Sequence, residues 1–137
     1  MKKIILLLIT IAASCLCFSQ TKNNAKDTLH FIYILKLNGK FKKEKNWSEV
    51  QTQTVCAMID YLEKLSLDGK VHMAGRTNYK YNHPSQFGIV LLEVSSEKEA
   101  IEIMRNDPAV KSKLMSAEIH PINIPVGNKQ LLQLSKQ

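Results

Sequence analysis

The order of the segments after residue 28 constrains the fold of this chain more than any other feature. Hydrophobic periodicity and turn residues predict a strand, a helix, two strands, a helix and a final strand. The four strands are expected over residues 30–37, 70–76, 87–94 and about 117–126, and the two main helices begin near residues 48 and 96. This succession is a split βαβ arrangement, which predicts an α+β domain.

The expected helix ends carry the residues that helix ends require. Residues 48–51 and 96–99 each place a Ser three positions before a Gln or Glu, which is the spacing of a capping box. Gly69 can adopt the left-handed backbone conformation that ends many helices. Asp107 precedes Pro108, a residue suited to the first turn of a helix, so we expect Asp107 to cap a further short helical segment.

The four strands differ in character in the way that a ferredoxin-like sheet requires. Strands 30–37 and 87–94 are apolar on both faces, whereas 70–76 alternates and 117–126 contains two prolines, which cannot donate to a ladder. The ferredoxin-like strand order 4-1-3-2 puts the first and third strands in the middle. We therefore expect a four-stranded antiparallel sheet with both helices on one face.

The other face of such a sheet has no helices to cover it. The apolar side chains that the central strands direct to this face would stay in water in a monomer. We therefore expect a homodimer in which two sheets pack face to face.

The first 19 residues have the layout of a secretory signal peptide, because Lys2 and Lys3 precede an apolar run over 4–13 and small residues up to Ser19. The run is shorter than the roughly 20 residues that cross a bilayer, so no transmembrane segment is expected. Export to the periplasm or the extracellular space follows. The expected division is a signal peptide over 1–19, a flexible lead-in over 20–28, a domain over 29–126 and a tail over 127–137.

A lipid-anchored form is the alternative route of export. Ala12-Ala13-Ser14-Cys15 contains the small residues and the cysteine of a lipid-attachment site, although Ala12 stands where such sites usually have Leu. Cleavage after Ser19 would instead remove Cys15 together with Cys17. Cys56 would then be the sole thiol, so no intramolecular disulfide is expected.

The net charge of +7 comes in part from five lysines within residues 36–45. Such a run usually forms a solvated loop, but it would also suit an anionic partner such as a lipid headgroup or a polysaccharide. Nucleic acid is not expected as a partner, because residues 88–91 lack the aromatic side chains with which RNA-binding domains of this fold stack on bases.

Several short segments together resemble the YCII-related family. The resemblance covers roughly residues 30–124 and implies a small dimeric α+β barrel, similar in fold to muconolactone isomerases and certain monooxygenases. The matching segments are Tyr61-Leu62-Glu63-Lys64-Leu65, Asp68-Gly69-Lys70-Val71, Met73-Ala74-Gly75, Ile89-Val90-Leu91-Leu92-Glu93-Val94 with Glu99-Ala100, and Asn106-Asp107-Pro108-Ala109-Val110.

The resemblance also implies an active site with an aspartate and a histidine, the latter eleven residues before the glycine that ends the first helix. Counted back from Gly69, that position is Met58 in this chain. A thioether cannot transfer protons, which argues against acid–base catalysis of the family type. Family members tend to have a proline after Gly75, whereas this chain has Arg76, a fixed cation that would suit a carboxylate ligand.

We therefore expect a module that binds a small anionic organic ligand or serves in protein interaction. His72 and Arg76 share a face of the second strand if its alternation is regular, and we expect that face to be the helix-free one. The complete set of candidate ligand-binding residues is Met58, His72, Arg76, Tyr79 and His83.

Two alternatives belong to other classes of protein. A small isomerase-like or lyase-like enzyme would use Asp107 as its acid or base and Arg76 as a clamp. In that enzyme His72 or His83 would replace the missing imidazole, although Asp107 also fits a purely structural helix cap. The other alternative is an envelope interaction protein that uses the basic stretch 36–45.

Neither a cofactor nor a metal ion is expected. The four histidines are scattered along the chain, and no His-x-x-x-His or Cys-x-x-Cys spacing is present. The methionines at positions 58, 73 and 104 have the spacing of core residues rather than of a heme-lining set.

Overall fold

A computed structural model describes residues 28–127. The expected signal peptide (1–19), the lead-in up to residue 27, the lipid-site alternative at Cys15 and the tail from residue 128 lie outside the described residues. No helix within the described range is both long and apolar enough to cross a membrane. The elements are β1 (Leu29–Leu37), the short 3-10 turns η1 (Gly39–Lys42) and η2 (Glu44–Asn46), α1 (Glu49–Leu67), β2 (Val71–Arg76), β3 (Gly88–Val94), α2 (Glu97–Asn106), α3 (Pro108–Lys111) and β4 (Met115–Pro121).

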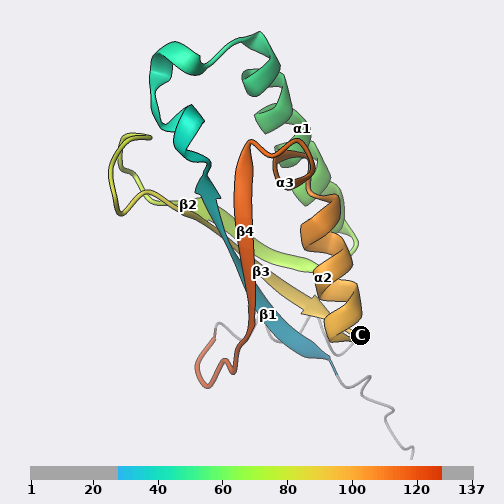
Figure 1. Ribbon diagram of the computed structural model, residues 1–137. Helices are drawn as coiled ribbons and strands as arrows, with labels where there is room; N and C mark the ends of the chain where they lie inside the picture. Colours follow the sequence, from blue (N-terminus) through green and yellow to red (C-terminus); the bar gives the residue numbers. More distant parts are fainter. Residues whose placement is uncertain (1–27, 128–137) are drawn as a thin grey trace, which may run out of the picture.

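The four strands form one antiparallel sheet in the order β2-β3-β1-β4, which is the expected order 4-1-3-2 seen from the other edge. All three α-helices lie on one side of this sheet (Figure 1). The α+β ferredoxin-like fold is therefore confirmed. The doubly apolar β1 and β3 are central and the proline-bearing β4 is at an edge, because a central strand needs its amides for two neighbours.

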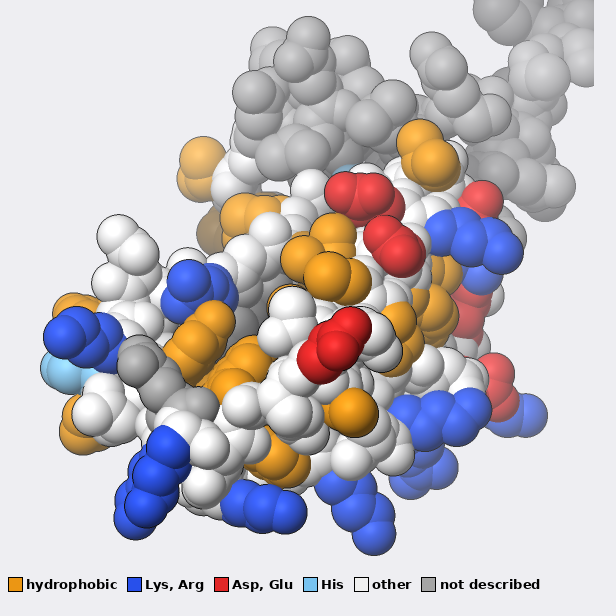
Figure 2. Space-filling model, turned by 90° about the horizontal axis from the view of Figure 1, so that it is seen from above, with side chains coloured by type: hydrophobic (Ala, Val, Ile, Leu, Met, Phe, Trp, Pro, Cys, Tyr) orange, Lys and Arg blue, Asp and Glu red, His pale blue; other side chains and the backbone are white. Residues whose placement is uncertain are grey.

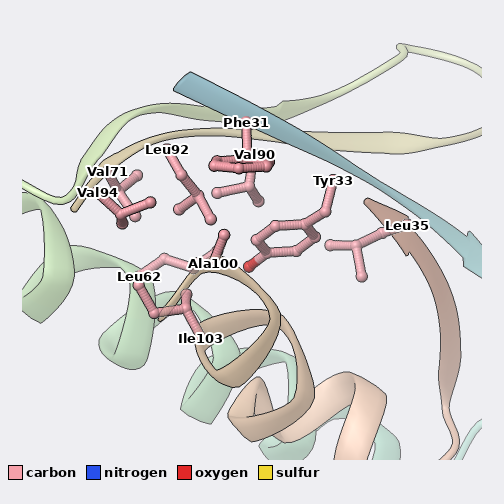
Figure 3. Close-up of a cluster of buried hydrophobic side chains, with 10 residues drawn as sticks. All are labelled: Phe31, Tyr33, Leu35, Leu62, Val71, Val90, Leu92, Val94, Ala100 and Ile103. Carbon is pink, nitrogen blue, oxygen red and sulfur yellow. The ribbon is translucent and has the colours of Figure 1, made fainter. Parts of the chain in front are cut away.

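The core lies between the sheet and the helices, where every second side chain of β1 and β3 points towards α1 and α2 (Figure 3). Leu62 of α1 and Ala100 and Ile103 of α2 meet them from the helix side. The buried sheet residues of this cluster are Phe31, Tyr33, Leu35, Val71, Val90, Leu92 and Val94. The intervening residues of β1 and β3 face the helix-free side, where the partly buried apolar ones are Ile32, Ile34, Ile89 and Leu91.

The expected helix ends form where the sequence places them. At the start of α1 the Ser48 amide donates to Oε1 of Gln51 at 2.9 Å, and at the start of α2 the Ser96 hydroxyl accepts from the Glu99 amide at 3.2 Å. Gly69 follows α1 with a φ of 72°, in the left-handed region that glycine enters without a steric penalty. These local signals fix where the two helices begin and where α1 stops.

Strand β4 begins and ends earlier than expected. It spans Met115–Pro121 rather than about 117–126, so that Pro121 is its last residue and Pro125 lies beyond it. The ladder ends at the pairing of Pro121 with Phe31, close to where β1 itself begins. The limit is therefore set by the length of the partner strand, which the pattern of a single segment does not contain.

A bulge early in β2 changes the face on which one of the candidate residues, Arg76, lies. After the bulge Ala74 pairs with the core residue Val90, so Arg76, two positions further on, also lies on the helix side. The His72 ring faces the helix-free side, where it bonds to Glu93. The expectation that His72 and Arg76 share a face was wrong, because an extra residue in a strand resets the alternation of its side chains.

Candidate functional site

A cavity of about 650 Å³ lies between helix α1 and the sheet. Small-molecule sites in proteins have volumes of about 300–1,000 Å³, so this cavity has the size of a ligand site. Most of its wall is apolar, with one stripe of α1 on one side and the inner face of the sheet on the other. The stripe consists of Val55, Met58, Ile59 and Leu62, and the sheet contributes Leu35 and Val90.

The cavity is open because only part of α1 packs closely on the sheet. Helix α1 has 19 residues, and its N-terminal end extends beyond the strands in Figure 1. Leu62 is buried in the core, whereas Ile59, one turn earlier, is 46 % exposed. The apolar stripe of the N-terminal half of α1 therefore faces a space that no other described element fills.

Two aromatic rings and one cation stand together at the cavity. The rings of Trp47 and Tyr81 are stacked, with centroids 4.7 Å apart and planes inclined by 15°, and both side chains line the space. The guanidinium carbon of Arg76 lies 5.5 Å from the centre of the Tyr81 ring. Trp47 is fixed by a hydrogen bond of 2.6 Å from its ring nitrogen to the Phe41 carbonyl. The loop after β2 and the segment before α1 thus meet beside the cavity.

The structure brings three of the five candidate ligand-binding residues together in the cavity wall, Met58, His72 and Arg76. Tyr79 and His83 stack on each other, with ring centroids 4.1 Å apart, and do not line the cavity among the described residues. Sequence reasoning did not select Trp47 or Tyr81. The only signal for them was their type, an aromatic residue in a polar connection, which does not show that the two segments touch.

His72 borders the cavity through its strand, but its ring belongs to a different cluster. Its Nε2 is hydrogen-bonded to Oε2 of Glu93 on the helix-free side, and His30 approaches the same oxygen from the neighbouring strand. The ligand-capable atoms of His30, His72 and Glu93 all lie within 4.8 Å of one another. The premise that the histidines are scattered therefore holds along the chain but not in space.

Asp107, the candidate acid or base, is fully buried away from the cavity wall. One carboxylate oxygen accepts from the Ala109 amide at 2.8 Å, which is the expected cap of α3, and the other accepts from the Tyr33 hydroxyl at 3.0 Å. Burial raises the pKa of Asp107 above its ordinary value, against the opposing effect of these hydrogen bonds. Burial and the nearby Asp107 carboxylate likewise raise the pKa of Tyr33.

Part of the basic stretch borders a second, shallower hollow of about 410 Å³, near Tyr81. Figure 2, seen from above Figure 1, shows Lys and Arg side chains along the lower and left edges of this end of the molecule, and most acidic side chains towards the upper right. The cations that border the hollow are Lys42, Lys43, Lys45 and Lys80.

Comparisons with known proteins assign nearly all of the described domain to a family. The family model for the YCII-related domain matches residues 29–123. Among solved structures, 5-chloro-2-hydroxyhydroquinone dehydrochlorinase from Burkholderia phenoliruptrix AC1100, in complex with 2,5-dihydroxybenzoquinone, is similar with a TM-score of 0.53 and 19% identity. The match covers 69% of this chain and 94% of that one, and at this identity it shows a shared fold. No functionally curated protein sequence matches the chain.

Proposed function

Since this chain belongs to the YCII-related domain family, we propose that it binds a small, mostly apolar organic acid in the cavity between α1 and the sheet. The observation that carries this proposal is the position of Arg76, a cation in the wall of an otherwise largely apolar space. A guanidinium can bind a carboxylate through two parallel hydrogen bonds, which fixes both the position and the orientation of the acid.

The aromatic pair supports a planar ligand. Trp47 and Tyr81 present stacked rings next to Arg76, and aromatic faces favour offset stacking with a further ring. The structural neighbour was solved with 2,5-dihydroxybenzoquinone, a planar ring with acidic hydroxyls, which makes this compound a useful probe. Glu63 also lines the cavity, but it is exposed, so solvent screens its charge.

Binding without acid–base chemistry is favoured over the isomerase-like or lyase-like alternative. Met58, which lines the cavity, offers no proton to transfer. Both carboxylate oxygens of Asp107 are engaged by Tyr33 and Ala109 in the core. A general acid or base has to come within hydrogen-bond reach of the group it serves, and Asp107 lies outside the cavity wall.

Thermal shift measurements test the proposal. The panel contains benzoate, hydroxybenzoates, small dicarboxylates and 2,5-dihydroxybenzoquinone, with benzamide as a neutral analogue of benzoate. A ligand that binds only the folded state stabilises it by RT ln(1 + L/Kd), where L is the free ligand concentration, so the melting temperature rises with the logarithm of the ligand concentration above Kd. We expect aromatic acids to raise it and benzamide to have a much smaller effect.

Variants at two arginines distinguish binding in the cavity from a general effect of positive surface charge. Arg76→Ala should lose the response to the acids, whereas Arg105→Ala, which removes an exposed arginine from α2 outside the cavity wall, should keep it. Glu63→Gln should keep or strengthen the response, because it removes a negative charge from the cavity. An Arg76→Ala protein that responds like the wild type, or a wild type that responds to no acid in the panel, contradicts the proposal.

The proposal includes a homodimer formed through the helix-free face of the sheet. The support is the apolar patch of partly buried isoleucines and leucine on β1 and β3, beside Met73 of β2, which is 47 % exposed. Light scattering at micromolar concentration should return twice the chain mass, and Ile34→Lys should shift it towards the monomer. A monomer mass for the wild type contradicts this part of the proposal.

The third part of the proposal is that the protein is exported. Measuring the intact mass of the protein purified from its host tests this part. Cleavage after Ser19 leaves a chain that starts at Gln20, whereas lipid attachment leaves one that starts at a modified Cys15. A mass that includes residues 1–14 excludes both forms.

A second candidate function is an envelope interaction through the basic stretch. The observation that favours it is the cluster of Lys42, Lys43 and Lys45 with Lys80, which joins two loops around one hollow. Retention on an anionic resin should fall when Lys42, Lys43 and Lys45 are changed to Gln. Unchanged retention would exclude this surface as the site.

A further inference from the structure

Three side chains that can bind a metal ion meet on the helix-free face of the sheet, away from the ligand cavity. His30 lies in β1, His72 in β2 and Glu93 in β3. Because β3 runs between β1 and β2, the carboxylate stands between the two imidazoles. His72 faces this side because it alternates with the core residue Val71, and the bulge that follows redirects only the later side chains of β2, Arg76 among them.

The three possible ligand atoms all lie within 4.8 Å of one another. Nε2 of His30 lies 3.5 Å from Oε2 of Glu93, and Nε2 of His72 is hydrogen-bonded to the same oxygen. Two ligands about 2.0–2.1 Å from a tetrahedral ion are about 3.3 Å apart. An ion would replace the direct His72–Glu93 hydrogen bond, and side-chain movements on the order of 1 Å would bring the three atoms to ligand spacing.

The cluster is held in place by its surroundings. The side chains of Glu93 and His72 are 4 % and 7 % exposed, and His30 is 22 % exposed. All three are attached to neighbouring strands of one sheet, the kind of rigid support that keeps ligands in position. His30 is the most exposed of the three, so the fourth position would open to solvent on its side.

The donor atoms of the cluster are one carboxylate oxygen and two imidazole nitrogens. This donor set suits a borderline divalent cation.

We infer that His30, His72 and Glu93 bind one divalent transition-metal ion of the zinc type, with solvent in the open position. Such an ion joins β1, β2 and β3 on the face of the sheet opposite to Arg76, and His72 is the one ligand whose strand also borders the acid-binding cavity. All three ligands come from one chain, so the site does not require the dimer, although it lies on the face that the proposed dimer covers.

Titration of the full protein, stripped of metal with a chelator, tests this inference. Zn²⁺ is added in a calorimeter, and Co²⁺ is added in parallel while its visible absorption is followed, because that spectrum reports the coordination geometry. We expect one ion per chain, a dissociation constant in the micromolar range or tighter, and a Co²⁺ spectrum typical of four or five ligands. Zn²⁺ should also raise the melting temperature.

Histidine variants identify the ligands. His30→Ala and His72→Ala should each weaken Zn²⁺ binding at least tenfold, whereas His120→Ala, which removes an exposed histidine from β4, should not. His30 is the most exposed of the three ligands, so its variant tests the site with the least risk to folding, and circular dichroism checks that it folds. Glu93→Gln removes the charge at nearly constant size and should also weaken binding.

Two results would overturn the inference. One is the absence of Zn²⁺ binding to the wild type at up to millimolar concentration, which would make the cluster a hydrogen-bonded His–Glu–His network only. The other is Zn²⁺ binding that persists unchanged in folded His30→Ala protein or disappears in His120→Ala, which would place the ion elsewhere. Neither result affects the response to organic acids, which depends on Arg76.

Discussion

The Tyr33 hydroxyl donates a hydrogen bond of 3.0 Å to the carboxylate of Asp107, 74 positions further along the chain, and both side chains are completely buried. Tyr33 comes from the centre of β1, and its hydroxyl points towards the helix layer in Figure 3. Asp107 is the residue between α2 and α3. One bond therefore ties the middle of the sheet to the junction of the last two helices.

Asp107→Ala should destabilise the protein by about 3 kcal/mol. The variant loses the cap of α3, and it leaves the Tyr33 hydroxyl buried without its partner. Tyr33→Phe should cost less, about 1–2 kcal/mol, because Asp107 keeps its bond to Ala109. Urea denaturation of both variants and of the double variant measures the two losses and their coupling. Equal losses in the single variants would show that the cap contributes nothing.

Asp107→Asn separates a structural role from a catalytic one. Asparagine is a good helix cap, so this variant should fold and should keep the thermal response to aromatic acids. The physical reason is that Asp107 does not line the cavity. Loss of the response in a folded Asp107→Asn protein would count in favour of the enzyme alternative.

The ion pair between Lys70 and Glu99 should make stability depend on pH in the acid range. The Lys70 ammonium, 2.9 Å away, and the Ser95 hydroxyl and amide lower the pKa of Glu99 from 4.5 to about 2. A carboxyl whose folded-state pKa is lowered contributes stability above its unfolded pKa and loses it as the pH falls through the folded value. Glu99→Gln should therefore cost about 0.5–1 kcal/mol at pH 6, since the pair is partly exposed.

The difference between wild type and Glu99→Gln should shrink from pH 4.5 towards pH 2, the interval between the two pKa values of Glu99. Urea denaturation at several pH values measures it. Glu102→Gln, which changes an exposed carboxyl on the same helix, is the control. Its free energy of unfolding should change with pH as that of the wild type does. A Glu99→Gln difference that stays constant down to pH 2 contradicts this account.

Gly69→Ala should destabilise the protein by about 1–2 kcal/mol, because residue 69 has a φ of 72° and side chains disfavour this conformation. The space around Gly69 is open, so the cost comes from the backbone rather than from a clash. Gly39→Ala is the matched control, since Gly39 also faces open space but has no positive φ, and it should stay within about 0.5 kcal/mol of the wild type. Thermal denaturation compares the two, and equal effects would refute the backbone explanation.

Met58→Trp should block the cavity. The larger side chain occupies space beside the α1 stripe, while Met58→Leu keeps nearly the same volume. The probe is anilinonaphthalene sulfonate, an aromatic anion whose fluorescence rises in apolar sites. We expect at least tenfold weaker binding in Met58→Trp and little change in Met58→Leu. Equal binding by the two variants would show that the dye does not enter this cavity.

The order and limits of most elements could be read from the chain, because they depend on neighbouring residues. The spacing of Ser48 and Gln51 and the position of Gly69 are local signals, and the structure contains the helix ends they predict. Hydrophobic pattern also separated central from edge strands, since a strand with helices or another layer on both sides has to be apolar on both faces. The length of β4 was not predictable in this way, because it depends on where β1 begins.

The candidate site shows the same division between local and distant causes. The sequence by itself determined the helix–sheet architecture and the presence of a thioether at Met58 and a cation at Arg76, because each is a property of one position or of its neighbours. Only the tertiary structure decided that Arg76 faces the helices with Trp47 and Tyr81, and that His30, His72 and Glu93 meet on the opposite face. The physical reason is that a single bulge reverses the direction of later side chains, and strand pairing brings together residues that are far apart in the chain.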